Sequence, residues 1–406
     1  MFGRKKFEDL YEDAVEAYQE GDLDEATRLC EKALDAAGSA KSNPDSARGE
    51  ALNLLAGIYR HQDRLEEARE AMLEALPLLE KDRGEDDVDF AGAVQNAGDL
   101  CLQTGDLARA RTLLQKALAL KAKVAGEDHE VLWLPYASLA TLEEEEGNDG
   151  KAAELFAKAL KAAAHDGSGD TLASLVEKRV EELIGMGRGE DAAEFAEKGQ
   201  ALLREVFEQD ITPYTEAEVK TWVFDFQLAQ MVRRCTMYQE SGILPHPLVQ
   251  VMQARASALT AAERYAGAVA VFEEVDAAAQ RGRRLSGPEA RYPEDMHLDS
   301  LARREFDAAN PLAPEPDTKE AAMMSLDGNA EDPKLLIDRA QFQYRFALAL
   351  HFLGQQTKDA AALRRAEERY LWAEPMFQQI VPPHHPFFQE WNANLAEVRE
   401  DLAAMG

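Results

Sequence analysis

The sequence predicts an all-α solenoid, in which antiparallel helix pairs stack one on the next. Composition is the first observation: Ala, Leu and Glu dominate the 406 residues and only 7% are aromatic, which is typical of helices rather than of sheets. The second is that 46% of the residues are hydrophobic, enough for a folded core. The third is an internal repeat of about 42 residues, a length typical of stacked helix pairs.

A short turn between two helices marks each repeat. It begins at Gly21, Asp63, Gly105 and Gly147, which stand at equal intervals along the chain, and a fifth copy follows at Gly187 after a slightly shorter interval. Glycine at this position can adopt a positive φ and end the first helix, and an Asp or Asn beside it can cap the second. The turn therefore separates a helix A from a helix B in every repeat.

Small side chains recur at fixed distances from the turns, with one larger residue between those of helix B. Helix A carries Ala14, Ala56, Gly98 and Ala140; helix B carries Ala26, Ala68, Ala110, Ala152 and Ala192, then Cys30, Met72, Leu114 and Phe156, then Ala33, Ala75, Ala117, Ala159 and Gly199. Helical periodicity places each set on one face. Small residues let helices A and B approach closely, and stacking buries the faces that one pair leaves open.

These residues resemble the tetratricopeptide repeat, whose signature is a small residue in helix A and then alanine, a bulky residue and alanine in helix B. The resemblance extends over about residues 10–203. The 42-residue period and the linkers at 84–88 and 126–131 are similar to those of kinesin light chains, although Asp87 replaces a typical histidine and Glu130 a typical proline. The resemblance implies a right-handed superhelix with helix A along its concave surface, and a protein-binding role.

The second half of the chain is less regular. A sixth repeat is predicted at 252–275, after a helical insertion at about 215–240. A seventh surrounds Gly354, with residues 355–363 expected as an extra segment between its two helices. Residues 385–402 predict a capping helix for the end of the array, with a dimerisation helix as the alternative.

An irregular segment rich in proline and arginine is expected from Arg281 to Pro333. Its prolines preclude long helices, although short ones are possible at 298–309 and 319–326. Its arginines form a basic island, which either folds back onto the acidic solenoid or serves as a partner-binding or autoinhibitory loop. The predicted organisation is a regular array at 1–205, an insertion with the sixth repeat at 206–280, the irregular segment at 281–333, and the seventh repeat with the capping helix at 334–406.

The net charge of −31 argues against several classes of function. A nucleic-acid binder needs clustered cations to neutralise phosphates, and an anionic membrane surface disfavours so acidic a chain. No apolar segment is long enough to span a bilayer, and no signal peptide is recognised near Met1. Three scattered cysteines suit a reducing compartment. The sequence therefore predicts a cytoplasmic protein with no membrane insertion, for which a monomer is favoured.

No enzyme motif is found, and no cofactor or metal is expected. Residues 147–152 faintly resemble a phosphate loop but lack its Ser or Thr. A calcium-like string begins at Asp166, but Thr171 stands where an EF-hand needs glycine, and Asp170 is expected to cap a helix instead. The acidic run at 143–146 is expected to be a solvated helix end or to attract a basic peptide.

The concave surface is the candidate site, because the resemblance places there the helix-A residues that face away from helix B. The residues expected on it are Tyr11, Tyr18, Asn53, Gly57, Arg60, Gln95, Asn96, Asp99 and Leu102. Asn53, Gln95 and Asn96 fall where kinesin light chains present amides to a peptide backbone, and an amide both donates and accepts hydrogen bonds. The alternative is that they are ordinary polar surface residues.

These observations predict a non-catalytic scaffold or adaptor that captures an extended or helical segment of a protein partner. The acidic charge favours a basic or apolar-anchored segment. Two alternatives stay open. One is a regulator switched by a small ligand or peptide, with residues 281–333 as its lid or output element, and the other is an enzyme built on the insertion around 222–238.

Overall fold

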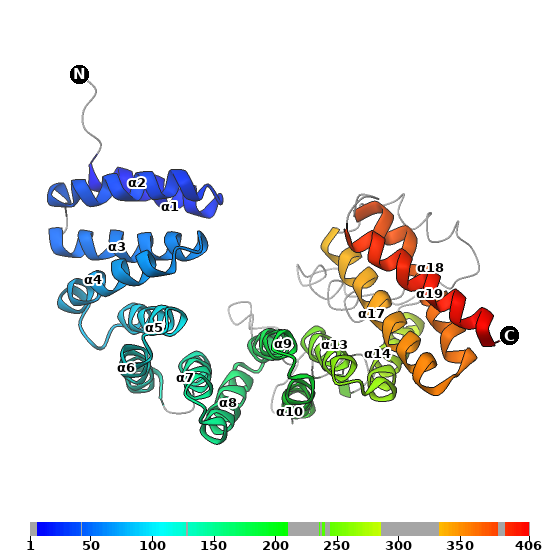
Figure 1. Ribbon diagram of the computed structural model, residues 1–406. Coiled ribbons are helices and arrows are strands. Elements are labelled where there is room, and N and C mark those ends of the chain that lie inside the picture. The colour runs from blue at the N-terminus through cyan, green and yellow to red at the C-terminus, as the bar shows by residue number, and fades with distance from the viewer. Residues whose placement is uncertain are drawn as a thin grey trace. The chain divides into compact units, whose positions relative to one another are not determined.

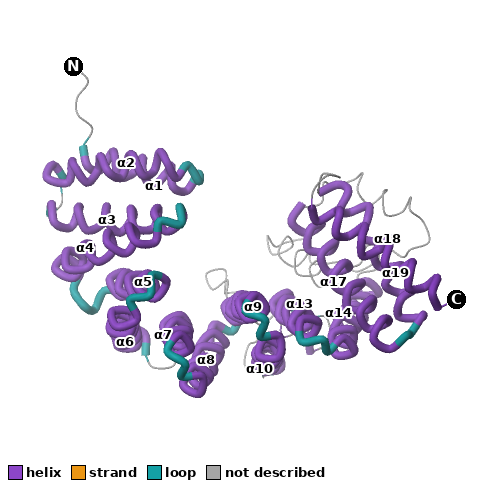
Figure 2. The backbone as a smooth tube through the Cα atoms, in the orientation of Figure 1, coloured by secondary structure: helices purple, strands orange, loops and turns teal. Residues whose placement is uncertain are grey.

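The computed structural model describes residues 6–41, 43–126, 129–209, 235, 238–239, 244–285, 333–380 and 386–405. Within these ranges every regular element is a helix and no strand occurs (Figure 1, Figure 2). The helices fall into two compact units, residues 1–165 (unit 1) and 166–406 (unit 2). The predicted all-α class is confirmed for the part of the chain described here.

Unit 1 consists of four helix pairs, in which each helix B also packs against helix A of the next pair. The pairs are α1 (Phe7–Gln19) with α2 (Leu23–Ala36), α3 (Pro44–His61) with α4 (Leu65–Arg83), α5 (Val88–Gln103) with α6 (Leu107–Ala125), and α7 (Trp133–Glu145) with α8 (Asp149–Ala163). Short 3-10 helices follow or precede some of these: η1 (Ala37–Ser39), η2 (Glu130–Leu132) and η3 (Ala164–Asp166). The stacking buries both sides of every internal helix pair.

The described part of unit 2 contains three further pairs and a final helix. These are α9 (Asp170–Gly185) with α10 (Gly189–Glu208), α13 (His246–Ala261) with α14 (Tyr265–Leu285), α17 (Pro333–Thr357) with α18 (Ala360–Ile380), and α19 (Pro386–Met405). The predicted sixth and seventh repeats coincide with α13/α14 and α17/α18. Trp391 and Val398 of α19 are buried, and the helix packs against α18 and α17. Whether α19 caps the array or joins two copies stays a prediction.

One turn geometry closes helix A in all seven of these pairs. A residue with positive φ follows the helix, and the next backbone N–H donates to the carbonyl oxygen five residues earlier, at 2.7–3.0 Å. The donor and acceptor residues are Asp22 and Ala17, Arg64 and Tyr59, Asp106 and Cys101, Asn148 and Glu143, Arg188 and Leu183, Arg264 and Leu259, and Asp359 and Gly354. The bond satisfies a carbonyl that the end of a helix otherwise leaves unpaired.

Three of the seven turns use a residue other than glycine at the positive-φ position. Asp63, Glu263 and Lys358 have φ values of 59°, 57° and 54°. The first two stand where the repeat spacing predicts a turn. The third lies four residues beyond Gly354, around which the seventh turn was expected.

The predicted segment 355–363 between the helices of the seventh repeat is therefore wrong. Helix α17 continues through Thr357 and α18 begins at Ala360. Gly354 lies inside α17, where an added Cβ would come within 2.6 Å of Leu363 Cγ on α18. Glycine at this position allows a close helix contact and does not form the turn.

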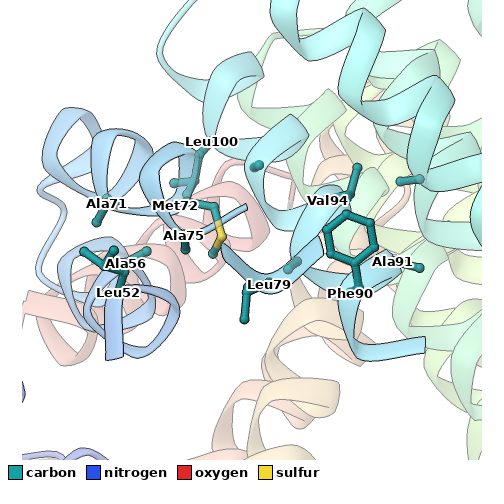
Figure 3. Close-up of a cluster of buried hydrophobic side chains, with 14 of the residues drawn as sticks. Leu52, Ala56, Ala71, Met72, Ala75, Leu79, Phe90, Ala91, Val94 and Leu100 are labelled. Atoms are coloured by element: carbon teal, nitrogen blue, oxygen red, sulfur yellow. The ribbon is translucent and has the colours of Figure 1, made fainter. Parts of the chain in front are cut away.

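The predicted small residues lie where helices A and B touch. Ala14, Ala26, Ala33, Ala68, Ala75, Ala110, Ala117, Ala140 and Ala159 are all 0% exposed. Figure 3 shows the core of the second and third pairs, in which Ala56 and Ala75 share one cluster with Met72 and Phe90. At Gly98 an added Cβ would come within 2.7 Å of Leu114 Cδ2, so that α5 and α6 could not approach as closely. The size pattern of the repeat is thus a packing requirement.

The expected helix caps are found in part. The carboxylates of Asp22 and Asp106 each accept a hydrogen bond from a backbone N–H three residues on, at 3.1 and 3.2 Å. Asn148 does not cap α8; its Nδ2 donates to Glu143 at 2.9 Å instead. Helix α9 begins at Asp170 itself, one residue earlier than expected, and the Asp170 N–H donates to Ser168 Oγ.

The linkers before helices A begin those helices in a common way. Asp87 accepts a hydrogen bond from the Phe90 N–H at 2.8 Å, and His129 Nδ1 accepts one from the Val131 N–H at 3.2 Å. The aspartate that replaces the typical histidine therefore keeps its role as an acceptor at the helix start.

Several predictions lie outside the described residues. The insertion at 215–240 is described only at 235 and 238–239, and the irregular segment only where α14 continues through Leu285 and where α17 begins. The four-segment organisation stays a prediction. Among the described residues no helix has the length and apolar character needed to cross a membrane.

Candidate functional site

The candidate site is the helix-A face of unit 1, which consists of the residues that the sequence places on the concave surface. These are Tyr11 and Tyr18 on α1, Asn53, Gly57 and Arg60 on α3, and Gln95, Asn96, Asp99 and Leu102 on α5. Successive helices A contact one another in two places, α1 with α3 and α5 with α7. Side chains of neighbouring repeats therefore meet along this face.

The two tyrosines of α1 are held differently. The Tyr18 hydroxyl lies 3.4 Å from His61 Nε2, and the two rings are 5.2 Å apart, so that this contact joins α1 to α3. Tyr11 stacks on Phe7 of its own helix at 5.6 Å between ring centroids. Burial raises the pKa of the Tyr11 phenol. Both side chains are half-buried, with part of each ring open to a ligand.

Asn53 and Asn96 carry the two amides of this face that are not used within the described part of the fold. Both residues are half-buried, and neither amide forms a hydrogen bond with another described residue. A side-chain amide offers donors and an acceptor at once, which matches the alternating groups of a peptide backbone.

Gln95 differs from these two, because it is only 1% exposed. Its Nε2 donates to both carboxylate oxygens of Asp99 at 3.1 Å and to Ser138 Oγ of α7 at 3.0 Å. Its Oε1 is buried and has no hydrogen-bond partner among the described residues. Gln95 thus lies beneath the face, where it positions Asp99 and ties α5 to α7.

Asp99 is the acidic group of the face, and its surroundings disfavour its charge. Burial raises the pKa of the Asp99 carboxyl above its ordinary value, against the lowering effect of hydrogen bonds from Ser138 and Gln95 and of the charges on Lys121 and Arg60. Lys121 is itself 9% exposed, and burial lowers its pKa. The charged form of a poorly solvated carboxylate is stabilised by a further cation nearby.

Two pairs show the register of neighbouring helices A. An added Cβ on Gly57 would lie 3.7 Å from the Tyr18 hydroxyl, and the charge of Arg60 acts on Asp99. The two residues of each pair are separated by the same interval along the chain, one residue on each of two successive helices A. The structure thus brings Gln95 and Asp99 together and leaves Asp99 within the electrostatic reach of Arg60, while Tyr11, Asn53 and Asn96 have no side-chain bond to that group among the described residues.

Two residues of this group were not predicted. Ser138 and Lys121 lie on α7 and α6, and both complete the surroundings of Asp99. The signal for Ser138 was present in the sequence, because it occupies in its repeat the position that Asn96 occupies one repeat earlier.

The acidic run at 143–146 is not simply a solvated helix end. Glu143 is 5% exposed, and Arg111 of α6 donates to its Oε1 and to Glu146 Oε2, both at 2.6 Å. The hydrogen bond from Arg111 holds the pKa of the Glu143 carboxyl below its ordinary value. These two carboxylates stabilise the contact of α6 with α7.

One cluster of unit 2 also carries titratable groups. His351 of α17 and Glu397 and Asp401 of α19 are the group of His, Asp and Glu in the described ranges whose ligand atoms lie within 4.8 Å of one another. Gln355 Nε2 donates to both carboxylates, at 3.0 and 2.9 Å, and His351 Nε2 lies 3.4 Å from Asp401. Hydrogen bonds within the cluster therefore join α17 to α19.

Comparison with known proteins identifies the repeats. Residues 14–81 and 90–164 match the family model of the tetratricopeptide repeat. These two stretches are tetratricopeptide repeats. The match falls within unit 1, and the turn that closes its helices A recurs in unit 2.

Several solved structures are similar to this chain. BtubC (BKLC) from P. vanneervenii is 17% identical, over 70% of this chain and 83% of that one, with a TM-score of 0.35. A putative kinesin light chain from Podospora anserina with nearly identical repeats is 18% identical, over 50% and 98%, with a TM-score of 0.40. The tetratricopeptide domain of P58(IPK) is 16% identical, over 98% of each chain, with a TM-score of 0.23. No curated protein matches the chain.

Proposed function

We propose that this protein is a non-catalytic scaffold or adaptor, which captures a basic or apolar-anchored segment of a partner protein on the helix-A face. The family supports the general role, because tetratricopeptide repeats mediate protein–protein interaction. All three cysteines are buried and none forms a disulfide among the described residues, which supports a reducing compartment and hence the cytoplasm.

Asp99 is the observation that carries the proposal. Its carboxylate stands in a partly buried place where ionisation is disfavoured, and Gln95 and Ser138 fix its position. A cationic side chain of the partner would replace the stabilisation by water that burial removes. Ion pairing at Asp99 therefore contributes more favourable free energy than pairing at an exposed carboxylate. The folded protein keeps a carboxylate whose ionisation is unfavourable, and a bound cation would offset that unfavourable free energy.

The flanking groups suit a segment of peptide rather than a lone cation. The amides of Asn53 and Asn96 can pair with a main chain without requiring one sequence. The half-buried rings of Tyr11 and Tyr18 offer apolar area for an anchoring side chain. Gln95 is not expected to touch the partner, because its amide is already used within the fold.

The test compares Asp99→Asn with the native protein in selection from a displayed library of random peptides. The native chain should enrich peptides with Lys or Arg, and the variant should lose that preference and bind the selected peptides at least tenfold more weakly. Asp89→Asn is the matched control, because Asp89 lies on the same helix and its side chain is 79% exposed. Equal enrichment by all three proteins would remove Asp99 from the site.

The same variant should change stability in the opposite direction. The pKa of Asp99 is raised in the folded state, so its charge destabilises the fold at pH 7, and this effect disappears as the pH falls through the raised value. We expect Asp99→Asn to be more stable than the native protein at pH 7, because it removes this disfavoured charge. Below the ordinary value of 3.8, where the carboxyl is neutral in both states, urea unfolding should no longer distinguish the two proteins.

A further inference from the structure

A cavity of about 600 Å³ lies in unit 1 among α6, η2, α7 and α8, and none of the residues that line it belongs to the helix-A face. Residues of α6 and α8, both helices B, form its two sides, and η2 with the first turn of α7 forms its floor. The floor and one side are apolar, with Leu132, Ala119 and the ring of Tyr136. Lys158, Lys161 and His165 line the α8 side.

No carboxylate pairs with either of these two lysines among the described residues, in contrast to three other lysines of this region. Among the described residues of the third and fourth pairs, Lys116, Lys123 and Lys151 each lie within ion-pair distance of a Glu or Asp. Neither Lys158 nor Lys161 has such a partner or another hydrogen bond among the described residues. In a chain with a net charge of −31, two unpaired cations at one cavity are a local positive site.

The cavity also has the size and lining of a small-molecule site. Pockets for such ligands measure about 300–1,000 Å³ and combine an apolar wall with a few charged or polar groups that orient the ligand. Here Lys158 Nζ lies 5.8 Å from the centre of the Tyr136 ring, so the ring holds the ammonium group beside the apolar floor. Charge and apolar surface therefore meet within one cavity.

We propose that this cavity binds a small amphipathic anion, with a carboxylate or comparable acidic head group on an apolar body. The head group would pair with Lys158 and Lys161, and the body would cover Leu132, Ala119 and the Tyr136 ring. The surrounding negative field repels anions in general, so binding needs both parts of the ligand. This site is independent of the helix-A face and of the partner segment proposed for it.

The test titrates octanoate into the full-length protein by calorimetry, beside acetate, which has the charge without the tail, and octylamine, which has the tail with the opposite charge. Octanoate should bind at one site per chain, and the other two should bind at least tenfold more weakly. Equal binding of octylamine would show an apolar surface without charge selection and would overturn the proposal. Equal binding of acetate would show general attraction to lysine and would overturn it as well.

Two variants locate the site. Lys158→Gln with Lys161→Gln should weaken octanoate binding at least tenfold, and Ala119→Phe, which fills the apolar side of the cavity and keeps both charges, should weaken it comparably. The matched control is Lys32→Gln with Lys178→Gln, two exposed lysines that do not line the cavity, with the same change of net charge. Binding that survives either cavity variant, or that the control weakens as much, places the anion elsewhere. Far-UV circular dichroism and the Tm confirm that each variant is folded.

Discussion

Arg111 shows at the residue scale how this acidic chain holds its carboxylates. One guanidinium donates to two glutamates of the next helix, and one of these, Glu143, is 5% exposed. A buried carboxylate without its partner loses much more free energy than an exposed one, because water cannot replace the lost hydrogen bond.

We expect Arg111→Ala to lower the free energy of unfolding by about 1–3 kcal/mol at pH 7, measured with urea. The pKa of Glu143 is lowered in the folded state, so the stabilisation is fully present above its ordinary value of 4.5 and is lost as the pH falls through the lowered value. The difference between variant and native protein should therefore shrink in acid.

Arg109→Ala provides the control, because Arg109 is 65% exposed and pairs only with Asp106 three residues earlier. Its loss should change stability by less than about 1 kcal/mol. Equal losses in the two variants would contradict the special role of Arg111.

At the residue scale, the sequence predicts which residues share a helix face. It does not predict which of their side chains remain unbonded and available to a partner. The helical spacing put Asn53, Gln95 and Asn96 together. Gln95 is buried because Ser138, 43 residues away, accepts its hydrogen bond, and local spacing does not carry that contact. Bonds between successive repeats decide whether an amide is available to a partner.

At the scale of the helices, a few small residues determine how closely two neighbouring helices pack. Ala110 is 0% exposed and lies in a cluster with Leu114, Leu139 and Leu142. A larger side chain there must push α6 away from its neighbours or adopt an unfavourable rotamer.

We expect Ala110→Leu to destabilise the protein by about 1–3 kcal/mol in thermal or urea unfolding. Ala108→Leu is the control on the same helix, because Ala108 is exposed and its replacement needs no space in the core. Should Ala110→Leu prove as stable as that control, the assignment of Ala110 to the helix contact would be wrong.

Helix boundaries were predictable wherever the turn residue repeated at its interval, and less so elsewhere. Glu263 was located correctly although it is not a glycine, because the residues around it follow the repeat pattern. Lys358 was missed because Gly354, a residue that packs inside α17, offered a more familiar turn signal. A glycine can serve either backbone conformation or close packing, and the sequence alone does not distinguish the two uses.

At the scale of the whole molecule, the chain divides into two units. Their boundary, at 165–166, falls between Gly147 and Gly187, where the repeat interval becomes slightly shorter than it is between the earlier turns. In an array of stacked repeats each pair depends mainly on its neighbours, so stability is expected to vary along the chain.

We expect the effect of Ala110→Leu to remain within unit 1. Hydrogen exchange followed by mass spectrometry should show faster exchange in α5–α8 and unchanged exchange in α17–α19, since each pair of a stacked array depends mainly on its own neighbours. Faster exchange in both units by the same factor would instead mean that the whole chain unfolds as one cooperative body.

The three turns without glycine are positions at which the stored protein could be made more stable. Asp63, Glu263 and Lys358 each hold a Cβ in a left-handed backbone, which costs about 1 kcal/mol relative to glycine, partly offset by the greater freedom that glycine gives the unfolded chain. Only main-chain atoms form the bond that closes these turns, and all three side chains are exposed. Replacing any of these three residues by glycine should therefore lengthen shelf life, and none of the three belongs to the core or to the residues of the helix-A face.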